Sequence, residues 1–199
     1  MRSQLGPEME TAIDTALSVL AKMSGGLRDV VIAGRAAERL RGTVRAAEAY
    51  AYHADFVAKS PELYQPETLS RIRTGAAITT SAYIEGRREL AHIRRIIDPV
   101  FQSVDVIITP TTPVAPLTIA QLNTDVKTAI ELATPAIRNT SPFDVYGWPT
   151  ISVPCGFTRS GLPIGLQISA PLGGDAVVLQ LAHAYEQATE WHKRRPRIG

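Results

Sequence analysis

The sequence predicts an α/β fold, and two patterns carry that prediction. Short runs of consecutive hydrophobic residues, bounded by glycine and proline, are typical of strands that are buried on both faces. Longer segments between these runs repeat hydrophobic residues every three or four positions, as amphipathic helices do. The chain has 199 residues, of which 45% are hydrophobic and 20% charged. It is therefore long enough to bury a substantial core, and one domain is its simplest organisation.

The first two helices and the first strand are predicted near the N-terminus. Residues Glu8 to Lys22 place hydrophobic side chains at helical spacing, and Pro7 precedes them where a first helical turn tolerates proline. The pair Gly25-Gly26 is expected to end this helix. Consecutive hydrophobic residues within Asp29 to Ala33 predict a buried strand, and an alanine-rich helix is predicted from Ala36 to Ala58.

The middle of the chain predicts two further helices and a second strand. A long helical segment is expected from about Thr68 to Val100, after Pro66. The run Val104 to Thr109 predicts a strand. It continues into Pro110 to Pro116, where three prolines exclude regular structure and keep the backbone extended. A short helix is predicted from Thr124 to Ile137.

The C-terminal third is organised around two hydrophobic runs. Thr150 to Val153 and Ile164 to Ile168 are separated by a connection rich in turn residues, Pro154 to Pro163. This pattern predicts a strand pair joined by a long loop. An amphipathic helix is expected from Asp175 to Thr189, and the basic tail from His192 to Gly199 is expected to fray.

Bulk properties exclude several classes of protein. The net charge of +2 is too small to indicate a nucleic-acid or membrane-surface partner. No hydrophobic run approaches the roughly 20 residues that span a bilayer. The first residues contain no apolar core of the kind that a secretory signal needs. The single cysteine, Cys155, cannot form an internal disulfide, so we expect a cytoplasmic protein.

Four motifs with fixed spacing lie in the C-terminal half of the chain. In chain order, they are Asp105-Val106-Ile107-Ile108-Thr109-Pro110-Thr111, Asp144-Val145-Tyr146-Gly147-Trp148-Pro149, Ser152-Val153-Pro154-Cys155-Gly156 and Gly161-Leu162-Pro163-Ile164-Gly165-Leu166-Gln167. Together they resemble the motifs of the amidase signature family. The resemblance covers nearly the whole chain, which is similar to the C-terminal part of a family member, somewhat under half of its length. It implies an α/β/α sandwich around a mixed sheet, of which residues 1–199 would form a single partial domain.

The resemblance also implies a chemistry whose reacting residues lie outside this chain. Family members hydrolyse carboxamides with a serine nucleophile, a second serine in a cis peptide and a lysine that accepts the proton. The corresponding Gly/Ser-rich motif is absent from the sequence, and Ser24-Gly25-Gly26 is better explained as a helix end. The lysines fall on predicted helices, loops or the tail. We therefore predict no catalytic residue here.

Other reactive side chains are better explained structurally. The histidines His53, His92, His183 and His192 have no G-x-S-x-G motif beside them and no metal-ligand spacing. Cys155, between a proline and a glycine at a strand end, is more typical of a small buried residue than of a nucleophile. No metal and no cofactor is predicted.

Three residues are candidates for substrate binding. The resemblance places Thr140 and Asp144 where family members often carry threonine and asparagine facing the acyl channel. Asp144 departs from the asparagine, and a carboxylate cannot replace an amide donor. Arg71 matches a stretch whose arginine binds the substrate carboxylate in tRNA-dependent amidotransferase A subunits, a task that a bidentate guanidinium suits.

We interpret the chain as the C-terminal portion of an amidase-type hydrolase of carboxamide C–N bonds, inactive alone. A split gene, a misassigned start or a truncation would each produce it. A non-catalytic binding module derived from an amidase is the alternative, and a hydrolase with an unrecognised site is a third. Expected partners are an amide substrate, once a catalytic half completes the site, and that N-terminal half or a second copy. No nucleic-acid or membrane partner is expected.

Overall fold

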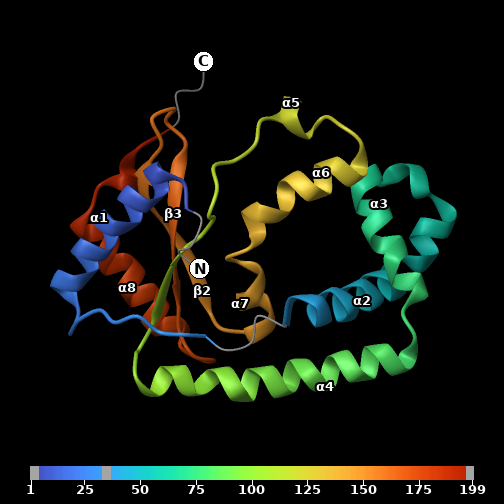
Figure 1. Ribbon diagram of the computed structural model, residues 1–199, viewed down its shortest axis with the longest axis horizontal. Coiled ribbons are helices and arrows are strands. Elements are labelled where there is room, and N and C mark those ends of the chain that lie inside the picture. The colour runs from blue at the N-terminus through green and yellow to red at the C-terminus, as the bar shows by residue number, and fades with distance from the viewer. Residues whose placement is uncertain (1–4, 33–36, 196–199) are drawn as a thin grey trace. The chain divides into compact units, whose positions relative to one another are not determined.

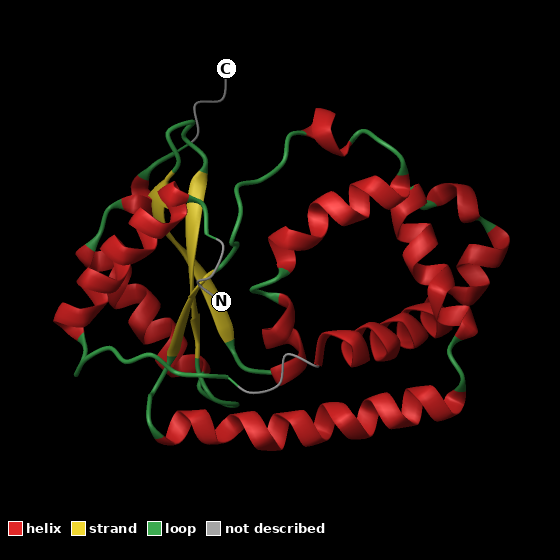
Figure 2. Cartoon of the chain, viewed as in Figure 1, coloured by secondary structure: helices red, strands yellow, loops and turns green. Residues whose placement is uncertain are grey.

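The chain forms two compact units in the computed structural model, which describes residues 5–32 and 37–195, with only the backbone for residues 37–41. The sheet unit contains the described residues within 1–31, 98–116 and 134–199. The helical unit contains those within 32–97 and 117–133. All strands of the described chain belong to the sheet unit (Figure 1, Figure 2).

The sheet consists of three antiparallel strands in the order β1-β3-β2. Strand β1 is Ile107–Pro110, β2 is Thr150–Phe157 and β3 is Pro163–Ser169. Strands β2 and β3 form the predicted hairpin, with a bulge between Pro154 and Gly156. Strand β1 pairs with the other side of β3, so β3 is central. The predicted strand from Val104 is shorter than expected, because regular pairing begins only at Ile107.

Two helices cover one face of this sheet. Helix α1 (Pro7–Met23) and helix α8 (Asp175–Ala188) lie side by side on it (Figure 1), close to the bounds that the sequence predicts. Their buried side chains and those of the strands form one hydrophobic cluster: Met9, Ile13, Ala16, Leu20, Val153, Cys155, Ile164, Leu166, Ile168, Ala182 and Tyr185. Fully burying a leucine or isoleucine contributes about 1.5–3 kcal/mol, so this cluster is the main source of stability in the unit.

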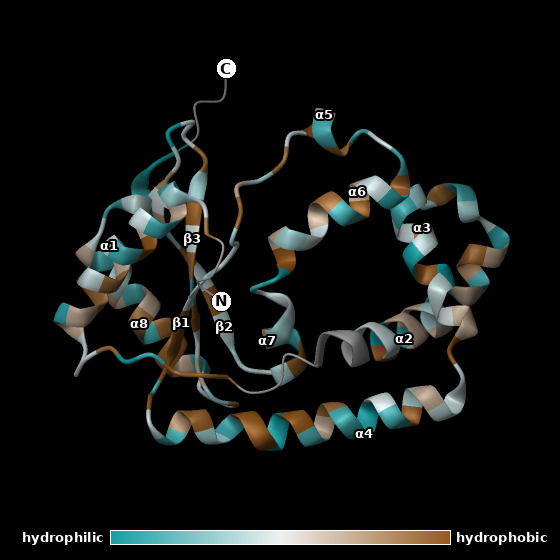
Figure 3. Cartoon of the chain, in the orientation of Figure 1, coloured by the Kyte–Doolittle hydropathy of each residue, from teal (hydrophilic) through white to brown (hydrophobic). Residues whose placement is uncertain are grey.

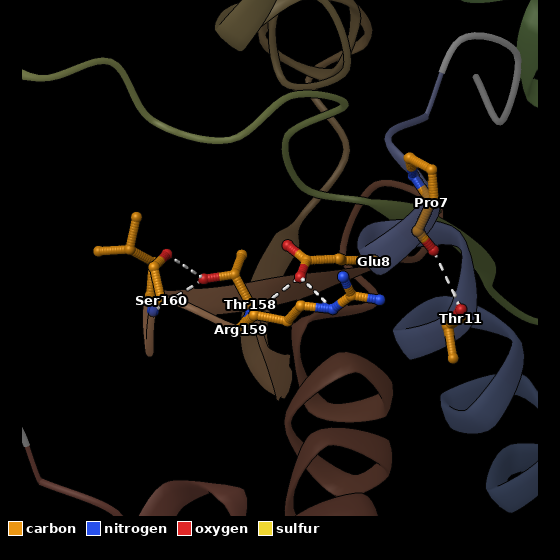
Figure 4. A network of polar contacts seen from close by, with 7 residues as sticks. Pro7, Glu8, Thr11, Thr158, Arg159 and Ser160 are labelled. Carbon is orange, nitrogen blue, oxygen red and sulfur yellow. Dashed lines mark hydrogen bonds and ion pairs between the residues drawn. The ribbon is translucent and has the colours of Figure 1, made fainter.

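Polar contacts attach the start of α1 to the loop between β2 and β3 (Figure 4). The Glu8 carboxylate accepts a hydrogen bond from the backbone N–H of Arg159 at 3.0 Å, and its oxygen lies 3.4 Å from Arg159 Nε. Within the loop, the hydroxyls of Thr158 and Ser160 are 2.8 Å apart. Arg159 is almost fully exposed, so its ion pair contributes little. The backbone bond is what fixes the loop against the helix.

The helical unit is built from long helices. Its elements are α2 (Ala37–Lys59), η1 (Pro61–Leu63), α3 (Pro66–Arg73), η2 (Thr74–Ala77), α4 (Thr80–Ile97), α5 (Ile119–Leu122) and α6 (Val126–Ala133). Helix α2 packs against α3 and α4, and α3 packs against α6. Hydrophobic and hydrophilic residues alternate along α4 (Figure 3), and its buried side chains include Ile93 and Ile97.

The predicted strand at Asp29 to Ala33 is wrong for residues 29–32, and Ala33 lies outside the described residues. Residues 29–32 form no regular structure, and the side chain of Val31 is 93% exposed. A hydrophobic run forms a strand only where another strand pairs with it, and none of the described strands does so here. Local pattern alone misassigned this segment.

Two predicted helices are interrupted in the structure. The segment expected to run from Thr68 to Val100 is divided at η2, and α4 begins after Thr79, whose side chain accepts a hydrogen bond from the Ala82 backbone. Gly75 in this break packs so closely that an added Cβ would lie 2.0 Å from the Ala46 carbonyl oxygen. Likewise, the helix predicted from Thr124 to Ile137 is α6 followed by η4 (Thr134–Ile137).

The α/β class is confirmed. The helix predicted from Ala36 corresponds to α2, which the structure describes from Ala37, and the tail beyond Arg195 lies outside the described residues. No helix within the described residues is long and apolar enough to cross a membrane. The prediction that residues 1–199 form one partial domain stays a prediction.

Candidate functional site: a pocket on the polar face of the sheet

Side chains of opposite character occupy the two faces of the sheet. On β3, Leu166 and Ile168 point into the hydrophobic cluster, and Gln167 between them points to the other face. Thr109 on β1 and Ser152 on β2 are the cross-strand neighbours of Gln167. We call Thr109, Gln167 and Ser152 the polar row. It crosses the whole sheet on the face opposite α1 and α8.

A pocket of about 550 Å³ lies over this polar face, within the sheet unit. Its walls come from the segment after β1, from helix α7 (Ser141–Tyr146), from the start of β2 and from the turn before α8. The lining residues are Thr111, Thr140, Phe143, Asp144, Gly147, Trp148, Pro149, Thr150, Ser152, Gln167, Leu172, Gly173 and Asp175. Hydroxyls, one amide and two carboxylates thus face the same space as two aromatic rings.

Short hydroxyl contacts organise the floor of the pocket. The hydroxyls of Thr111 and Ser152 are 2.6 Å apart, and those of Thr150 and Ser169 are 2.8 Å apart. A glycine is required beside the first pair, because a Cβ at Gly165 would lie 2.7 Å from the Thr111 hydroxyl. The contact of Ser152 is another hydroxyl, so the floor offers hydroxyl donors and acceptors for hydrogen bonding.

Buried amides hold the polar row in place. Gln167 is 2% exposed, and its Nε2 donates to the Thr109 hydroxyl at 3.1 Å and to the Asn139 carbonyl at 3.4 Å. Asn139 is fully buried, and its Nδ2 donates to the carbonyl of Pro110 at 2.9 Å. Buried polar groups are costly without partners, so these bonds fix the start of α7 against β1 and β3.

One wall depends on an aromatic cluster. Trp148 is 4% exposed, and its indole N–H donates to the Asp98 carboxylate at 2.9 Å. Its ring centroid lies 4.6 Å from that of Phe101 and 5.9 Å from that of Phe143. Gly147, with φ of 72°, ends α7 in the left-handed conformation that places Trp148 beside the pocket.

The structure brings together two of the three predicted binding residues. Thr140 and Asp144 both line the pocket, and the Thr140 hydroxyl donates to the Ile137 carbonyl at 3.2 Å. Arg71 is not among the described lining residues. It lies near the end of α3 in the helical unit and forms an ion pair with Glu67 at 2.6 Å, one helical turn away. The substrate-binding roles of all three residues stay predictions.

Sequence reasoning missed several lining residues. Gln167 and Ser152 are inside the recognised motifs, and each is a polar residue between two apolar neighbours, which is a signal for a face turned away from the core. Thr111 follows the end of a strand and is surrounded by prolines, and a hydroxyl at such a place is a further signal of a face turned away from the core. The contributions of Leu172, Gly173 and Asp175 had no such signal, because they depend on where the turn before α8 is placed.

The reactive side chains considered from the sequence lie elsewhere. Cys155 is 1% exposed in the hydrophobic cluster, and burial raises the pKa of its thiol to about 12. His53 contacts the Tyr64 hydroxyl at 2.9 Å. Within the described chain, no three histidine, cysteine or acidic side chains are grouped so that they could hold a metal ion.

Comparison with known proteins gives consistent matches. The family model described as Amidase matches residues 11–179. The chain is 30% identical to an amidase of Pseudomonas putida, covering 98% of this chain and 42% of that protein. It is 37% identical to the A subunit of the glutamyl-tRNA(Gln) amidotransferase of Synechococcus sp. (strain CC9902), covering 77% of this chain and 31% of that protein.

The fold matches as well. A structure of 6-aminohexanoate cyclic dimer hydrolase complexed with substrate superposes with a TM-score of 0.83, over 97% of this chain and 44% of that one, at 24% identity. The chain therefore spans less than half the length of these three matched proteins. Its motifs, its fold and the family match over most of its residues agree: this chain belongs to the amidase family.

Proposed function

We propose that this chain is the part of an amide-hydrolysing enzyme that forms one wall of the substrate pocket and three strands of the sheet, with the reacting groups supplied by a part of the enzyme that lies outside these 199 residues. The observation that carries the proposal is the pocket on the polar face of the sheet. Thr140 and Asp144, which the family resemblance assigns to the acyl channel, both line it.

The chemistry of the pocket supports binding of a carboxamide. Its hydroxyls can donate to an amide carbonyl or accept from an amide N–H, and its aromatic rings can cover the apolar part of a substrate. Hydrolysis needs more, because an activated nucleophile and donors for the developing oxyanion must meet at the scissile bond. The sequence contains no Gly/Ser-rich motif with a following serine, so we assign those groups to a completing part of the enzyme, outside these residues. The cytoplasmic location stays a prediction.

The test is reconstitution. The purified chain, alone, is expected to hydrolyse no simple amide and to leave a fluorophosphonate serine probe unbound. It is then mixed with the portion of the Pseudomonas putida amidase that lies outside its match to this chain. Amide hydrolysis should appear only in the mixture. Probe labelling of the chain alone, abolished by one Ser→Ala change in it, would overturn the proposal.

A matched pair of variants tests the pocket within the reconstituted enzyme. Thr140→Val removes a lining hydroxyl that also bonds to a backbone carbonyl, and we expect KM for the amide to rise roughly 2- to 10-fold, since one hydrogen bond contributes about 0.5–1.5 kcal/mol. Thr11→Val removes a hydroxyl with a similar contact, to the Pro7 carbonyl at 3.0 Å, on the far side of the sheet. It should leave KM unchanged, and equal effects of the two variants would contradict the assignment.

A further inference from the structure

Backbone N–H and C=O groups point outward along the free edge of β2, and the pocket does not account for them. We propose that this edge, at Thr150 and Ser152, receives a strand from the completing part of the amidase, and that the added strand brings side chains onto the pocket face of the sheet. This inference rests on the proposed function for the identity of its partner. Its geometry comes from the register of the three strands.

The register determines which backbone groups of β2 point outward. The Ala170 N–H donates to the Pro149 carbonyl at 3.1 Å, so residues 149 and 170 form a hydrogen-bonded pair. Such pairs alternate with non-hydrogen-bonded ones in an antiparallel ladder. Ile151 therefore bonds to Ile168, whereas Thr150 and Ser152 are in non-hydrogen-bonded pairs with Ser169 and Gln167. The N–H and C=O groups of Thr150 and Ser152 point away from β3.

These outward groups are open in the described part of the chain. No described residue donates to or accepts from the backbone of Thr150 or Ser152 on that side, and both residues are exposed. Two N–H and two C=O groups, spaced two residues apart, are the arrangement to which an extended segment pairs. The edge therefore has the hydrogen-bonding pattern of an unfinished sheet.

The opposite edge of the sheet, at β1, offers fewer free backbone groups for pairing with a further strand. The Thr111 N–H donates to the Gly165 carbonyl at 2.9 Å, which by the same alternation turns Ile108 and Pro110 of β1 outward. Pro110 has no N–H, and its carbonyl is already bonded to Asn139 Nδ2. Only Ile108 is left within β1, and one residue cannot support a ladder. Strand addition is therefore directed to β2.

The length of the open edge is also defined. Pro154, the next outward residue after Ser152, has a carbonyl but no N–H to offer. Further along, a bulge between Pro154 and Gly156 interrupts the regular register of β2. The added strand thus pairs chiefly with Thr150 and Ser152. Because the side chains of both line the pocket, alternate side chains of the added strand lie on the same face.

The choice of occupant follows from the matched proteins. The fold of this chain is retained over 97% of its length in the cyclic dimer hydrolase, yet it covers only 44% of that chain, and it covers 42% of the Pseudomonas putida amidase. More than half of each matched protein therefore lies outside the match and is available to supply a strand. A second copy of this chain is the competing occupant, and the test separates the two.

Amide hydrogen exchange of the whole chain provides the test. Alone, the Thr150 and Ser152 amides should exchange fast, while the Ile151 and Val153 amides, bonded to β3, should be protected. Adding the portion of the Pseudomonas putida amidase outside the match should slow exchange at Thr150 and Ser152 at least tenfold and leave Ile151 and Val153 little changed. Protection of all four amides in the dilute isolated chain would overturn the inference.

Variants sharpen the test. Ser152→Pro removes the outward N–H without touching the ladder to β3 and should weaken association about fivefold or more, the effect of about one hydrogen bond. Ser152→Ala loses the contact with Thr111 but keeps the N–H, and should associate more tightly than Ser152→Pro. If Ser152→Pro fails to fold, the Thr150→Pro variant and the hydrogen-exchange pattern test the same inference. Equal association of the proline and alanine variants would contradict the inference.

The outcomes separate the inference from the function on which it rests. If activity returns without protection at Thr150 and Ser152, the inference about the β2 edge is wrong and the proposed function stands. If protection appears without activity, the inference about the edge is right and the proposed function fails. Absence of any association overturns both. Protection that rises with the concentration of the chain alone identifies a second copy as the occupant and overturns the choice of partner.

Discussion

The two units of this chain bury their hydrophobic side chains in different ways. The sheet unit encloses one hydrophobic cluster between its strands and helices α1 and α8, and Leu166 and Ile168 at its centre are fully buried. The helical unit buries isolated side chains at helix contacts, such as Val44, Ile72 and Ile93. Both units leave some large side chains in water, among them Tyr52, which is 72% exposed, and Leu172, which is 81% exposed.

This difference indicates that the sheet unit and the helical unit have different roles. Every described residue that lines the pocket belongs to the sheet unit, where the buried amides and the hydroxyl contacts fix its walls. A binding surface is held more precisely on helices and strands than on loops, and α7, β2 and β3 carry part of this pocket. Among the described residues of the helical unit, Arg71 is the one that we predict to bind substrate, and its side chain is 43% exposed. The comparison predicts distinct responses to substitution in the two units.

The largest expected effect comes from removing a core side chain. Leu166→Ala should lower the free energy of unfolding of the sheet unit by about 2–5 kcal/mol, since the rigid cluster around the central strand cannot collapse into the cavity. Ile93→Ala in α4 should fall toward the lower end of that range, because Ile93 is buried outside the hydrophobic cluster and loses contacts with fewer buried side chains. Denaturant unfolding, with amide exchange to assign each change to a unit, measures both. A larger cost for Ile93→Ala would reverse the comparison.

The second effect concerns close packing in the helical unit. Gly75→Ala should destabilise this unit by about 1–3 kcal/mol, because the new Cβ would lie 2.0 Å from the backbone oxygen of Ala46 and the helices must move apart. Gly42→Ala, in α2 of the same unit, is the control. Nothing lies within 4 Å of its Cβ, and the substitution should stabilise the helix by about 0.5–1 kcal/mol. Equal melting temperatures for the two variants would contradict the packing at Gly75.

Prediction from sequence succeeded where local pattern and tertiary structure agree. The hairpin and the first and last helices were recovered because their hydrophobic residues repeat with the period of the element that they form. The segment at Val31 failed because three consecutive hydrophobic residues specify burial only if a partner strand exists. The break near Gly75 failed because it depends on the approach of α2, which no local pattern records.

The pocket was predictable to a smaller extent. Thr140 and Asp144 were found through the family resemblance, and the structure places both in one pocket. Composition and spacing alone would not have found them. Gln167 could have been noticed, since a buried amide within an apolar strand needs partners on the opposite face. Which backbone groups of β2 point outward is beyond sequence reasoning, because a shift of one residue in register would exchange them.

A third effect is a loss of stability in alkaline solution that originates in the sheet unit. Burial raises the pKa of the Cys155 thiol from 9.0 to about 12, and burial raises that of the Tyr185 phenol from 10.0 to about 12. The unfolded chain therefore releases these protons at lower pH than the folded chain. The stability that the neutral groups contribute is complete below pH 9 and is lost progressively between pH 9 and 12.

Unfolding of the wild type and Cys155→Ala at about pH 8, 10 and 11 measures the share of the thiol. The difference in stability between the two should shrink as pH rises, because alanine has no proton to lose. A thiol reagent at about pH 8 should label the folded wild type only at the rate at which the sheet unit opens. Immediate labelling would show that the thiol is accessible, and a constant difference across the series would contradict the linkage.

The smallest effect on stability, and the sharpest question about the helical unit, concerns Arg71. Its ion pair with Glu67 is on the surface, with both side chains more than 40% exposed, so Arg71→Ala should cost at most about 0.5 kcal/mol of stability.

The effect of Arg71 on substrate binding is a separate prediction. If Arg71 holds a substrate carboxylate in the reconstituted enzyme, the loss of a charge-assisted bond of about 1.5–3 kcal/mol should raise KM for a carboxylate-bearing amide by roughly 10- to 150-fold. A neutral amide of the same size should be unaffected. Glu67→Gln is the matched control, since it removes the competing carboxylate and leaves the guanidinium, and it should maintain or lower that KM. An unchanged KM for the carboxylate substrate in Arg71→Ala would remove the helical unit from substrate binding and leave recognition to the pocket of the sheet unit.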